Sequence, residues 1–552
     1  MAVQQERWGS RIGLILAVAG NAVGLGNFLR FPAQAVQNGG GAFIIPYLVS
    51  FLVMGIPLLW IEWAIGRHGG RYGFHATPGA MHAMGRHWWW KYIGVFGIFT
   101  NLTVASYYAF IESWTLGFVW YSLTGAFNGL PADQISGFFS WYLGITPDGG
   151  LFTFSPPAIT FFVITLALNI WILSRGLSGG VEKASKIGMP LLLFFGALLA
   201  IRALTLHAGE QGAVNDAALG LDFLWRPQFD SLTNPNVWLA AAGQIFFTLS
   251  VGMGSIHCYA SYLRKDDDIA LNAATAGWTN EFVEVVLGGT IIVPIAAAYL
   301  GLEWLQANVG FEMGFRTMPV LFQNWGPWFA TIAGVAWFGL LFFAGVTSSL
   351  AMGQPIMAFL EDEFSIERRR AAVYFGFTVL FLALPSVLLY NAGAFNEFDY
   401  WAGTFSLVVF GLAEVILFAW VFGIRNGWEE ITRGADIRVP VIFRFLIKYV
   451  TPVFLLAVFI GAMVKPADGN WIAAISGLFT GAGWNLAPDS VVGSVLHIGV
   501  EDTRWFVDGA ITRLAIIDLT RLLLLSTYLG ISTMVFLAFR KHRHRNFSTE
   551  DV

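Results

Sequence analysis

The chain has 552 residues, of which 56% are hydrophobic and 12% are charged, with 31 basic and 35 acidic side chains. Soluble domains carry about 25% charged residues, so this chain lacks the solvated surface of an ordinary soluble protein. A net charge of −4 gives no reason to expect a nucleic-acid partner. The only cysteine, Cys258, excludes an intramolecular disulfide and a cysteine metal cluster.

Apolar runs long enough to cross a bilayer recur along the whole chain. A transmembrane helix needs about 20 mostly apolar residues, and the runs lack the alternation typical of a membrane barrel. We therefore predict an all-α polytopic membrane protein with about twelve spans. They are expected at 11–35, 42–67, 91–122, 158–175, 187–205, 236–263, 274–304, 332–360, 373–390, 398–424, 449–465 and 513–539.

Basic residues fall before the first span and in every second connection, and "RKHR" follows the last span. By the positive-inside rule this pattern places both termini in the cytoplasm and implies an even number of spans. The first span is too long for a cleaved signal and lacks a cleavage site. We expect a multi-pass protein of a prokaryotic inner membrane, in contact with its lipid bilayer. Segment 470–497 is moderately apolar and is interpreted as an external or interfacial insertion.

Two predicted spans carry polar, glycine-rich interruptions. "GNAVGLGNF" (20–28) interrupts the first, and "FFTLSVGMGS" (246–255) interrupts the sixth. Glycine inside a helix costs about 1 kcal/mol relative to alanine, so each cluster predicts a weak point. An offset of five spans gives two five-span units opposite orientations, which indicates an inverted-repeat transporter with a site at mid-membrane. Helix packing on small residues is the alternative.

Broken spans expose backbone groups that a ligand can satisfy. Amides at half-helix N-termini suit an anion, and carbonyls at C-termini suit a cation. Oxygen-bearing side chains, which a hard cation such as sodium prefers, cluster at or near the breaks. They include Asn21, Asn27, Thr248, Ser250, Asn280 and the hydroxyls of 347–349. The residues alone therefore predict a cation-coupled carrier of a small zwitterion, without naming the solute.

Several motifs resemble the neurotransmitter:sodium symporter family, in particular its bacterial leucine transporter branch. They are "GNAVGLGNFLRFP", "NGGGAFIIPY", "GQIFFTLSVGMGSI", "YASYLRKDDD", "TNEFVEV", "LLFFAGVTSSLAM", "AFLEDE" and "DYWAGT". The similarity runs to about residue 450. It implies a 5+5 inverted repeat with discontinuous first and sixth helices, plus two extra C-terminal helices. The corresponding units are 1–205 (helices 1–5), 206–424 (helices 6–10) and 425–552 (helices 11 and 12 with the insertion and the basic tail).

The resemblance also implies two sodium sites and no organic cofactor. The first site would use the Ala22 carbonyl, the side chains of Asn27, Thr248 and Asn280, and the carboxylate of the substrate. The second would use the carbonyls of Gly20, Val23 and Ala344 with the hydroxyls of Thr347 and Ser348. The amino-acid substrate would be bound by Asn21, Ala22, Leu25, Gly26, Val104, Tyr108, Phe247, Thr248, Ser250, Met253, Ser348 and Met352.

Charged residues match the family's gates. Arg30 and Asp399 are expected to close the outside with Tyr108 and Phe247. An inner gate is expected from Asp362, Trp8, Tyr262 and Gln354. The family's arginine at this gate is Gln5 here, and the sequence leaves open whether Arg7 replaces it or is only a positive-inside anchor.

Two carboxylates are expected to balance charge inside the membrane. Glu62 resembles the family's acceptor of backbone amides from the broken sixth span. Glu284 stands where chloride-dependent relatives have a small polar residue, so we predict chloride-independent transport. Met253 and Met352 stand where the leucine branch has Phe and Ile. Because methionine is flexible, we expect a pocket that accepts varied apolar side chains.

These features together predict a sodium-coupled symporter of neutral hydrophobic amino acids, leucine-like or larger and aromatic, with alternating access around a mid-membrane site. It would not be an enzyme, because no catalytic pair or metal centre is recognised. The alternatives are a non-transporting or regulatory member of the same fold and a membrane-embedded enzyme. The sequence leaves open whether two copies pair as a homodimer.

Overall fold

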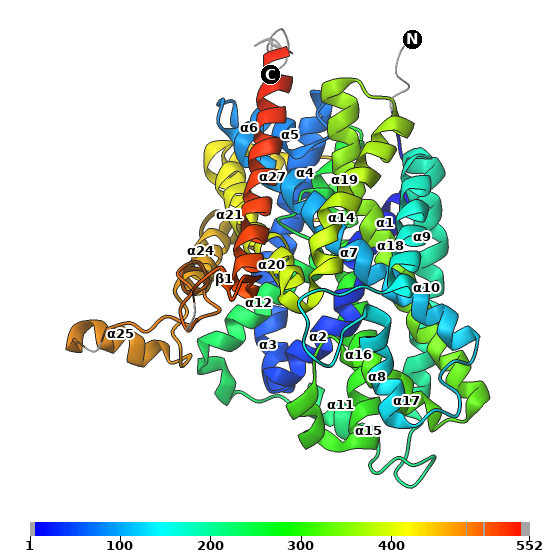
Figure 1. The fold of residues 1–552 in the computed structure, drawn as a ribbon. Helices are drawn as coiled ribbons and strands as arrows, with labels where there is room; N and C mark the ends of the chain where they lie inside the picture. The colour runs from blue at the N-terminus through cyan, green and yellow to red at the C-terminus, as the bar shows by residue number, and fades with distance from the viewer. Residues whose placement is uncertain (1–5, 482, 501–502, 542–552) are drawn as a thin grey trace.

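The computed structural model describes residues 6–481, 483–500 and 503–541, and the described chain is mostly helical (Figure 1). Ten of its helices are long and apolar enough to cross a membrane, which confirms the predicted polytopic class. The shorter pair α1 (Arg11–Ala22) and α2 (Leu25–Gln37) passes the same test together, with a bend of 43°. The predicted sixth span is divided between α12 (Pro235–Leu249) and α13 (Ser255–Ser261).

Each of the ten long helices overlaps one of the predicted spans. Several consist of two α-helical parts joined by a π-helical turn, as in Gly41–Arg71, Ile269–Asn308 and Ala394–Val421. The spans comprise α3 (Gly41–Ser50) with α4 (Ile56–Arg71), α7 (Val95–Leu123) preceded by α6 (Trp90–Ile93), α9 (Pro156–Leu173), α10 (Glu182–Leu204), α14 (Ile269–Glu281) with α15 (Gly289–Asn308), α18 (Pro327–Phe364), α19 (Arg368–Leu388), α20 (Ala394–Tyr400) with α21 (Ser406–Ile416), α23 (Ile442–Phe445) with α24 (Thr451–Val464), and α27 (Arg513–Lys541).

Short helices gather at the two ends of this bundle. At one end, uppermost in Figure 1, lies the basic connection with α5 (Thr77–Gly85). At the opposite end lie the basic-poor connections with α8 (Ala132–Leu143), α11 (Ala218–Trp225), α16 (Met313–Arg316) and α17 (Met318–Gln323). Basic and basic-poor connections are thus segregated to opposite ends, as the positive-inside rule requires of a spanning protein.

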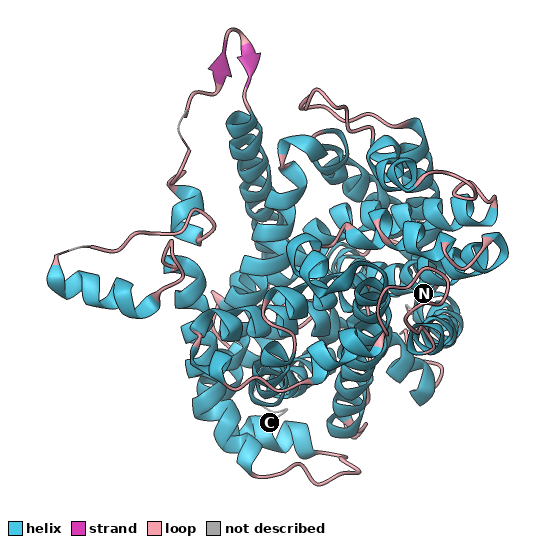
Figure 2. Ribbon diagram, turned by 90° about the horizontal axis from the view of Figure 1, so that it is seen from below, coloured by secondary structure: helices cyan, strands magenta, loops and turns pink. Residues whose placement is uncertain are grey.

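The C-terminal insertion lies beside the bundle. It contains α25 (Trp471–Thr480), α26 (Val491–Val495) and a hairpin of β1 (Phe506–Val507) and β2 (Ala510–Ile511), paired antiparallel with Phe506 opposite Ile511. Figures 1 and 2 show α25 projecting sideways, and Figure 2 shows the hairpin at the periphery. Ile472 and Phe479 on α25 are more than 80% exposed, which is typical of a surface that contacts lipid rather than water. The placement of this segment outside or at the membrane interface stays a prediction.

The core places the two broken spans at its centre. α1 packs against α10, α14 and α18, while α13 packs against α4 and α18. α18 and α7 form the most extensive helix pair. The breaks at 23–24 and 250–254 are therefore enclosed by α7, α18 and α4. The inverted repeat over 1–205 and 206–424 stays a prediction, although each unit begins with a broken span.

Candidate functional site

The first break is short and is held by its own side chains. α1 ends at Ala22 and α2 begins at Leu25. The Asn27 amide oxygen accepts a hydrogen bond from the Gly24 N–H at 2.8 Å, and the Tyr108 hydroxyl accepts one from the Leu25 N–H at 3.0 Å. These bonds satisfy two of the amides that the start of a helix leaves unpaired. The positive end of α2 is thereby directed at the site.

The second break is longer and more contorted. Ser250, Gly252 and Gly254 all have positive φ angles, of 53°, 70° and 93°. Glu62 Oε1 accepts a hydrogen bond from the Gly252 N–H at 2.6 Å, which is the contact expected of this carboxylate. The Asn101 side chain donates to the Met253 carbonyl at 2.6 Å. Groups from α4 and α7 thus replace the helical hydrogen bonds that the break removes.

The two breaks contact each other directly. The Ser250 hydroxyl donates to the Asn21 carbonyl at 3.0 Å, and the Ser255 hydroxyl donates to the Asn21 side-chain oxygen at 3.2 Å. The Asn21 amide nitrogen is buried and has no hydrogen-bond partner among the described residues. A buried donor of this kind is costly unless it is paired. It is therefore available to a ligand carboxylate.

A cavity of about 30 Å³ lies between the breaks. A cavity of this size has room for about two water molecules, so an amino acid needs the lining side chains to move apart. The lining includes every residue predicted to bind substrate except Leu25, whose amide faces Tyr108 instead. The lining residues are Asn21, Ala22, Gly24, Gly26, Asn27, Val104, Tyr108, Phe247, Thr248, Ser250, Met253, Ser348 and Met352.

The residues predicted for the first sodium site lie together beside this cavity. The Asn27 amide nitrogen donates to Asn280 Oδ1 at 2.8 Å, and the Asn280 amide nitrogen donates to Thr248 Oγ1 at 3.0 Å. Glu284 accepts hydrogen bonds from Asn27, Gln244 and Thr248. Neutral oxygens with one adjacent carboxyl group form a donor set that fits a small hard cation.

The second predicted sodium site lies where α1 approaches α18. The Ser348 hydroxyl donates to the Gly20 carbonyl at 3.3 Å, and the Thr347 hydroxyl donates to the Ala344 carbonyl at 3.2 Å. A Cβ on Gly20 would lie 2.9 Å from Thr347 Cβ, so only glycine permits this approach. Val23, the remaining predicted ligand, is fully buried and directly follows the last residue of α1. The donors are again hydroxyls and carbonyls, which fits sodium chemically.

The predicted outer gate residues lie near the cavity but contact different partners. The Arg30 guanidinium lies 4.3 Å from the centre of the Phe247 ring. Asp399 Oδ1 accepts a hydrogen bond from the Tyr107 hydroxyl at 2.8 Å. Sequence reasoning assigned Tyr108 to this gate and missed Tyr107. Both tyrosines are buried on α7, but neighbouring residues of a helix point about 100° apart, so Tyr108 lines the cavity with Phe247 and Tyr107 reaches Asp399.

At the predicted inner gate, the Trp8 indole donates to the Tyr259 carbonyl at 3.1 Å, and Gln354 donates to the Tyr262 hydroxyl at 3.3 Å. Asp362 accepts a hydrogen bond from the His75 N–H at 3.0 Å. Burial lowers the pKa of His75 to about 4, so its ring is neutral at physiological pH.

Sequence reasoning missed a cationic residue at this gate. Arg368 forms ion pairs of 3.2 Å with Glu6 and with Glu361, and it also donates to Gln354 at 2.7 Å. The N-terminal segment therefore contributes a carboxylate to this network. Arg7 lines a cavity of about 560 Å³ beside Trp8 and Tyr262. Gln5 lies outside the described residues.

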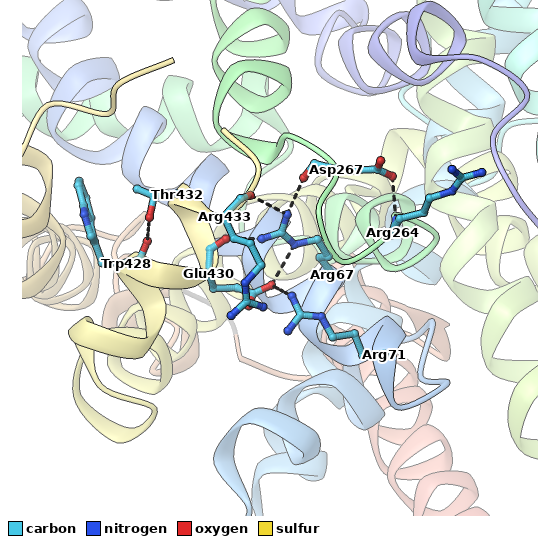
Figure 3. Close-up of polar contacts among 8 residues, drawn as sticks. All are labelled: Arg67, Arg71, Arg264, Asp267, Trp428, Glu430, Thr432 and Arg433. Carbon is cyan, nitrogen blue, oxygen red and sulfur yellow. Dashed lines mark hydrogen bonds and ion pairs between the residues drawn. The ribbon is translucent and has the colours of Figure 1, made fainter. Parts of the chain in front are cut away.

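A buried ion cluster ties α4 to the segment that follows α13 (Figure 3). Arg67 donates to Glu430 Oε1 at 2.9 Å and to the Asp267 carbonyl, and Arg71 also pairs with Glu430. Burial alone would raise the pKa of Glu430, but Arg67 and Arg71 outweigh it and hold that pKa below its ordinary value. Glu430 lies on α22 (Ile424–Thr432), so α4, α22 and the loop with Asp267 meet at the Arg67 side chain.

The fold and the site define a helical membrane transporter with two discontinuous spans. The sequence profile of the Sodium:neurotransmitter symporter family matches residues 5–134 and 157–492, and the chain belongs to that family. The family consists of sodium-coupled symporters, so the protein is a sodium-dependent transporter and not an enzyme. This confirms the resemblance inferred from the motifs.

Individual relatives agree with this assignment. An uncharacterized sodium-dependent transporter of Methanocaldococcus jannaschii is 32% identical over 471 residues, which cover 83% of this chain and 90% of the relative. Sodium-dependent nutrient amino acid transporter 1 of Drosophila erecta is 24% identical, with 84% and 78% covered. The crystal structure of MhsT in complex with L-phenylalanine superposes with a TM-score of 0.71 at 28% identity, covering 82% of this chain and 99% of MhsT.

Proposed function

We propose that the protein is a symporter that couples sodium entry to the uptake of neutral hydrophobic amino acids, including aromatic ones. The observation that carries the proposal is the meeting of the two breaks over one cavity, where the unpaired side-chain amide nitrogen of Asn21 lies beside apolar side chains. The Leu25 and Gly26 amides with Asn21 and Tyr108 would bind the carboxylate, and the carbonyls around Ala22 and Phe247 would bind the ammonium group.

The apolar part of the cavity defines the side-chain preference. Val104, Phe247, Met253 and Met352 line it without a charged group. Two methionines give this wall flexible, unbranched contacts that adapt to ligands of different shape. The presence of L-phenylalanine in the related MhsT structure supports an aromatic substrate.

Two sodium ions would accompany each amino acid. The first would be held by Asn27, Thr248 and Asn280 next to the substrate carboxylate, so loss of substrate removes a ligand from the ion. The second would join Gly20 and Val23 on α1 to Ala344, Thr347 and Ser348 on α18. Because α1 and α18 meet there, a bound ion would hold α1 against α18.

Glu284 would supply the negative charge that compensates sodium. It accepts hydrogen bonds from two groups of the first sodium site. A fixed carboxylate in this position removes the need for a bound anion, so transport is expected to be independent of chloride. Replacing chloride by gluconate would leave uptake unchanged, and a strong loss would contradict this role.

Uptake into proteoliposomes tests the function. A sodium gradient should drive accumulation of labelled leucine or phenylalanine, and collapse of the gradient should abolish it. Competition by each of the twenty common amino acids then ranks the substrates. We expect large neutral side chains to compete best, and a strict preference for glycine or alanine would refute the proposed specificity.

The orientation follows from the segregation of basic connections. We place the protein in the cell (inner) membrane, with the end that carries Arg67, Arg71 and α5 in the cytoplasm and α8 and α11 outside. Labelling of single cysteines introduced on α5 and α8 in a Cys258→Ser background would test this. An impermeant reagent applied to intact cells should reach α8 alone.

A further inference from the structure

Three ionisable side chains meet in the core outside the amino-acid cavity. Glu62 lies on α4, His257 on α13 and Glu414 on α21, and each is at most 1% exposed. His257 Nδ1 lies 3.5 Å from Glu62 Oε2, and His257 Nε2 lies 3.3 Å from Glu414 Oε1. One ligand atom from each residue lies within 4.8 Å of the others. We call these residues the Glu–His–Glu cluster.

The cluster places two carboxyl groups against one imidazole without a cationic partner. No lysine or arginine of the described chain pairs with either carboxyl group. Both oxygens of Glu414, both nitrogens of His257 and Glu62 Oε2 are buried without a hydrogen-bond partner among the described residues. Burying charged groups in this way is costly unless a cation compensates them.

We propose that the Glu–His–Glu cluster binds one divalent transition-metal cation of the Zn²⁺ class. Imidazole nitrogen and carboxylate oxygen are zinc ligands, with bonds of about 2.0–2.2 Å, and ligands of a tetrahedral ion then lie roughly 3.4 Å apart. The 3.3 and 3.5 Å spacings involve the two different nitrogens of one imidazole, and one ligand atom from each residue lies within 4.8 Å of the others. Binding a single ion would therefore require a turn of the imidazole that brings one nitrogen toward both carboxylates. Calcium and magnesium prefer oxygen ligands throughout, so the histidine selects a transition metal.

Such an ion would hold three segments around the second break. The other oxygen of Glu62 accepts the Gly252 N–H. α13 packs closely on α4, because a Cβ on Gly66 of α4 would lie 2.3 Å from the His257 carbonyl. Glu414 ties α21 to the same point. Metal binding would therefore resist movement of α13 relative to α4 and α21, and we expect it to slow transport.

Metal binding to the purified full-length transporter tests the proposal independently of the substrate. The protein is stripped with EDTA, equilibrated with Zn²⁺, and its bound metal is measured by mass spectrometry. We expect the unaltered protein to bind one zinc ion per chain. His257→Gln and Glu414→Gln should each bind zinc at least tenfold more weakly. Substitution with Co²⁺ should give the visible d–d absorption of a low-coordinate site.

Two controls separate this site from other ligands. A His82→Ala/His87→Ala variant removes histidines of the basic connection and should retain the bound zinc. Glu112→Gln alters another fully buried carboxylate, bonded to Asn169 and Ser349, and should also retain it. If the variants of the cluster do not fold, the Co²⁺ spectrum of the unaltered protein decides. Absence of that spectrum, or equal zinc binding by unaltered protein and His257→Gln, would show that protons alone compensate the cluster and would overturn the proposal.

Discussion

The two broken spans use glycine for different physical reasons. In the first break, Gly20, Gly24 and Gly26 have ordinary φ angles, and glycine is needed there because a side chain would collide with its neighbours. A Cβ on Gly26, for example, would lie 2.4 Å from Phe247 Cε1. In the second break, Gly252 and Gly254 have positive φ angles, which L side chains rarely adopt. Glycine thus allows neighbouring side chains to approach the backbone closely in the first break, and it allows the backbone to adopt positive φ angles in the second.

The sharpest test of this comparison is Gly252→Ala. The residue has a φ of 70°, and its Cβ would lie 2.2 Å from the Leu407 carbonyl oxygen. We expect a loss of about 2 kcal/mol or more in stability, measured as a lower melting temperature and yield of monodisperse protein. Gly243→Ala on α12 meets nothing within 4 Å and should not be destabilising. Equal stability of the two variants would contradict the role assigned to Gly252.

The first break should depend on Asn27 for binding more than for folding. Asn27→Ala removes the acceptor of the Gly24 N–H and an oxygen of the proposed sodium site. We expect sodium affinity to fall by at least tenfold, whereas the loss of the cap should lower the free energy of unfolding by only about 1 kcal/mol. Stabilisation of the purified protein by increasing sodium measures this. Asn38→Ala, at the other end of α2, should bind sodium normally, and unchanged affinity in Asn27→Ala would exclude Asn27 as a ligand.

A smaller effect is expected from Tyr108→Phe. The change removes the acceptor of the Leu25 N–H and a proposed partner of the substrate carboxylate. Leaving a buried donor unpaired costs about 1–3 kcal/mol, so substrate affinity should fall roughly 5- to 100-fold. Competition binding with labelled amino acid measures it. Tyr121→Phe lies on the same helix away from the cavity and should behave like the unaltered protein.

The smallest expected effect is a change in specificity from Met253→Phe at the second break. A rigid ring in place of the flexible thioether reduces the room for large side chains. The affinity for phenylalanine relative to leucine should fall a few-fold, with stability little changed. The ratio of inhibition constants for the two amino acids gives the result, and an unaltered ratio would show that Met253 does not set the pocket size.

Local patterns predicted much of the fold and of the candidate site. The apolar runs located the spans, and the glycine clusters located both breaks, because both signals depend on neighbouring residues. The family motifs brought Asn27, Thr248 and Asn280 to one place, where the structure also gathers them. The roles of these residues in binding remain predictions.

Contacts between distant segments could not be derived in this way. Arg368 meets Glu6 across 362 positions of sequence, and His257 meets Glu414 across 157. The different use of glycine in the two breaks was also hidden, because composition does not reveal φ. Each of these features depends on tertiary packing, which the spacing of residues along one helix does not specify.

The ion cluster around Glu430 has a consequence for how the transporter can move. Arg67 binds the α22 carboxylate and the Asp267 carbonyl at once (Figure 3). The loop that follows α13, the second half of the sixth span, is thereby bonded to α4, which also binds α22. Any rearrangement that opens the cavity toward this end of the bundle must move α4, the 264–268 loop and α22 together, or break several charge-assisted hydrogen bonds at once.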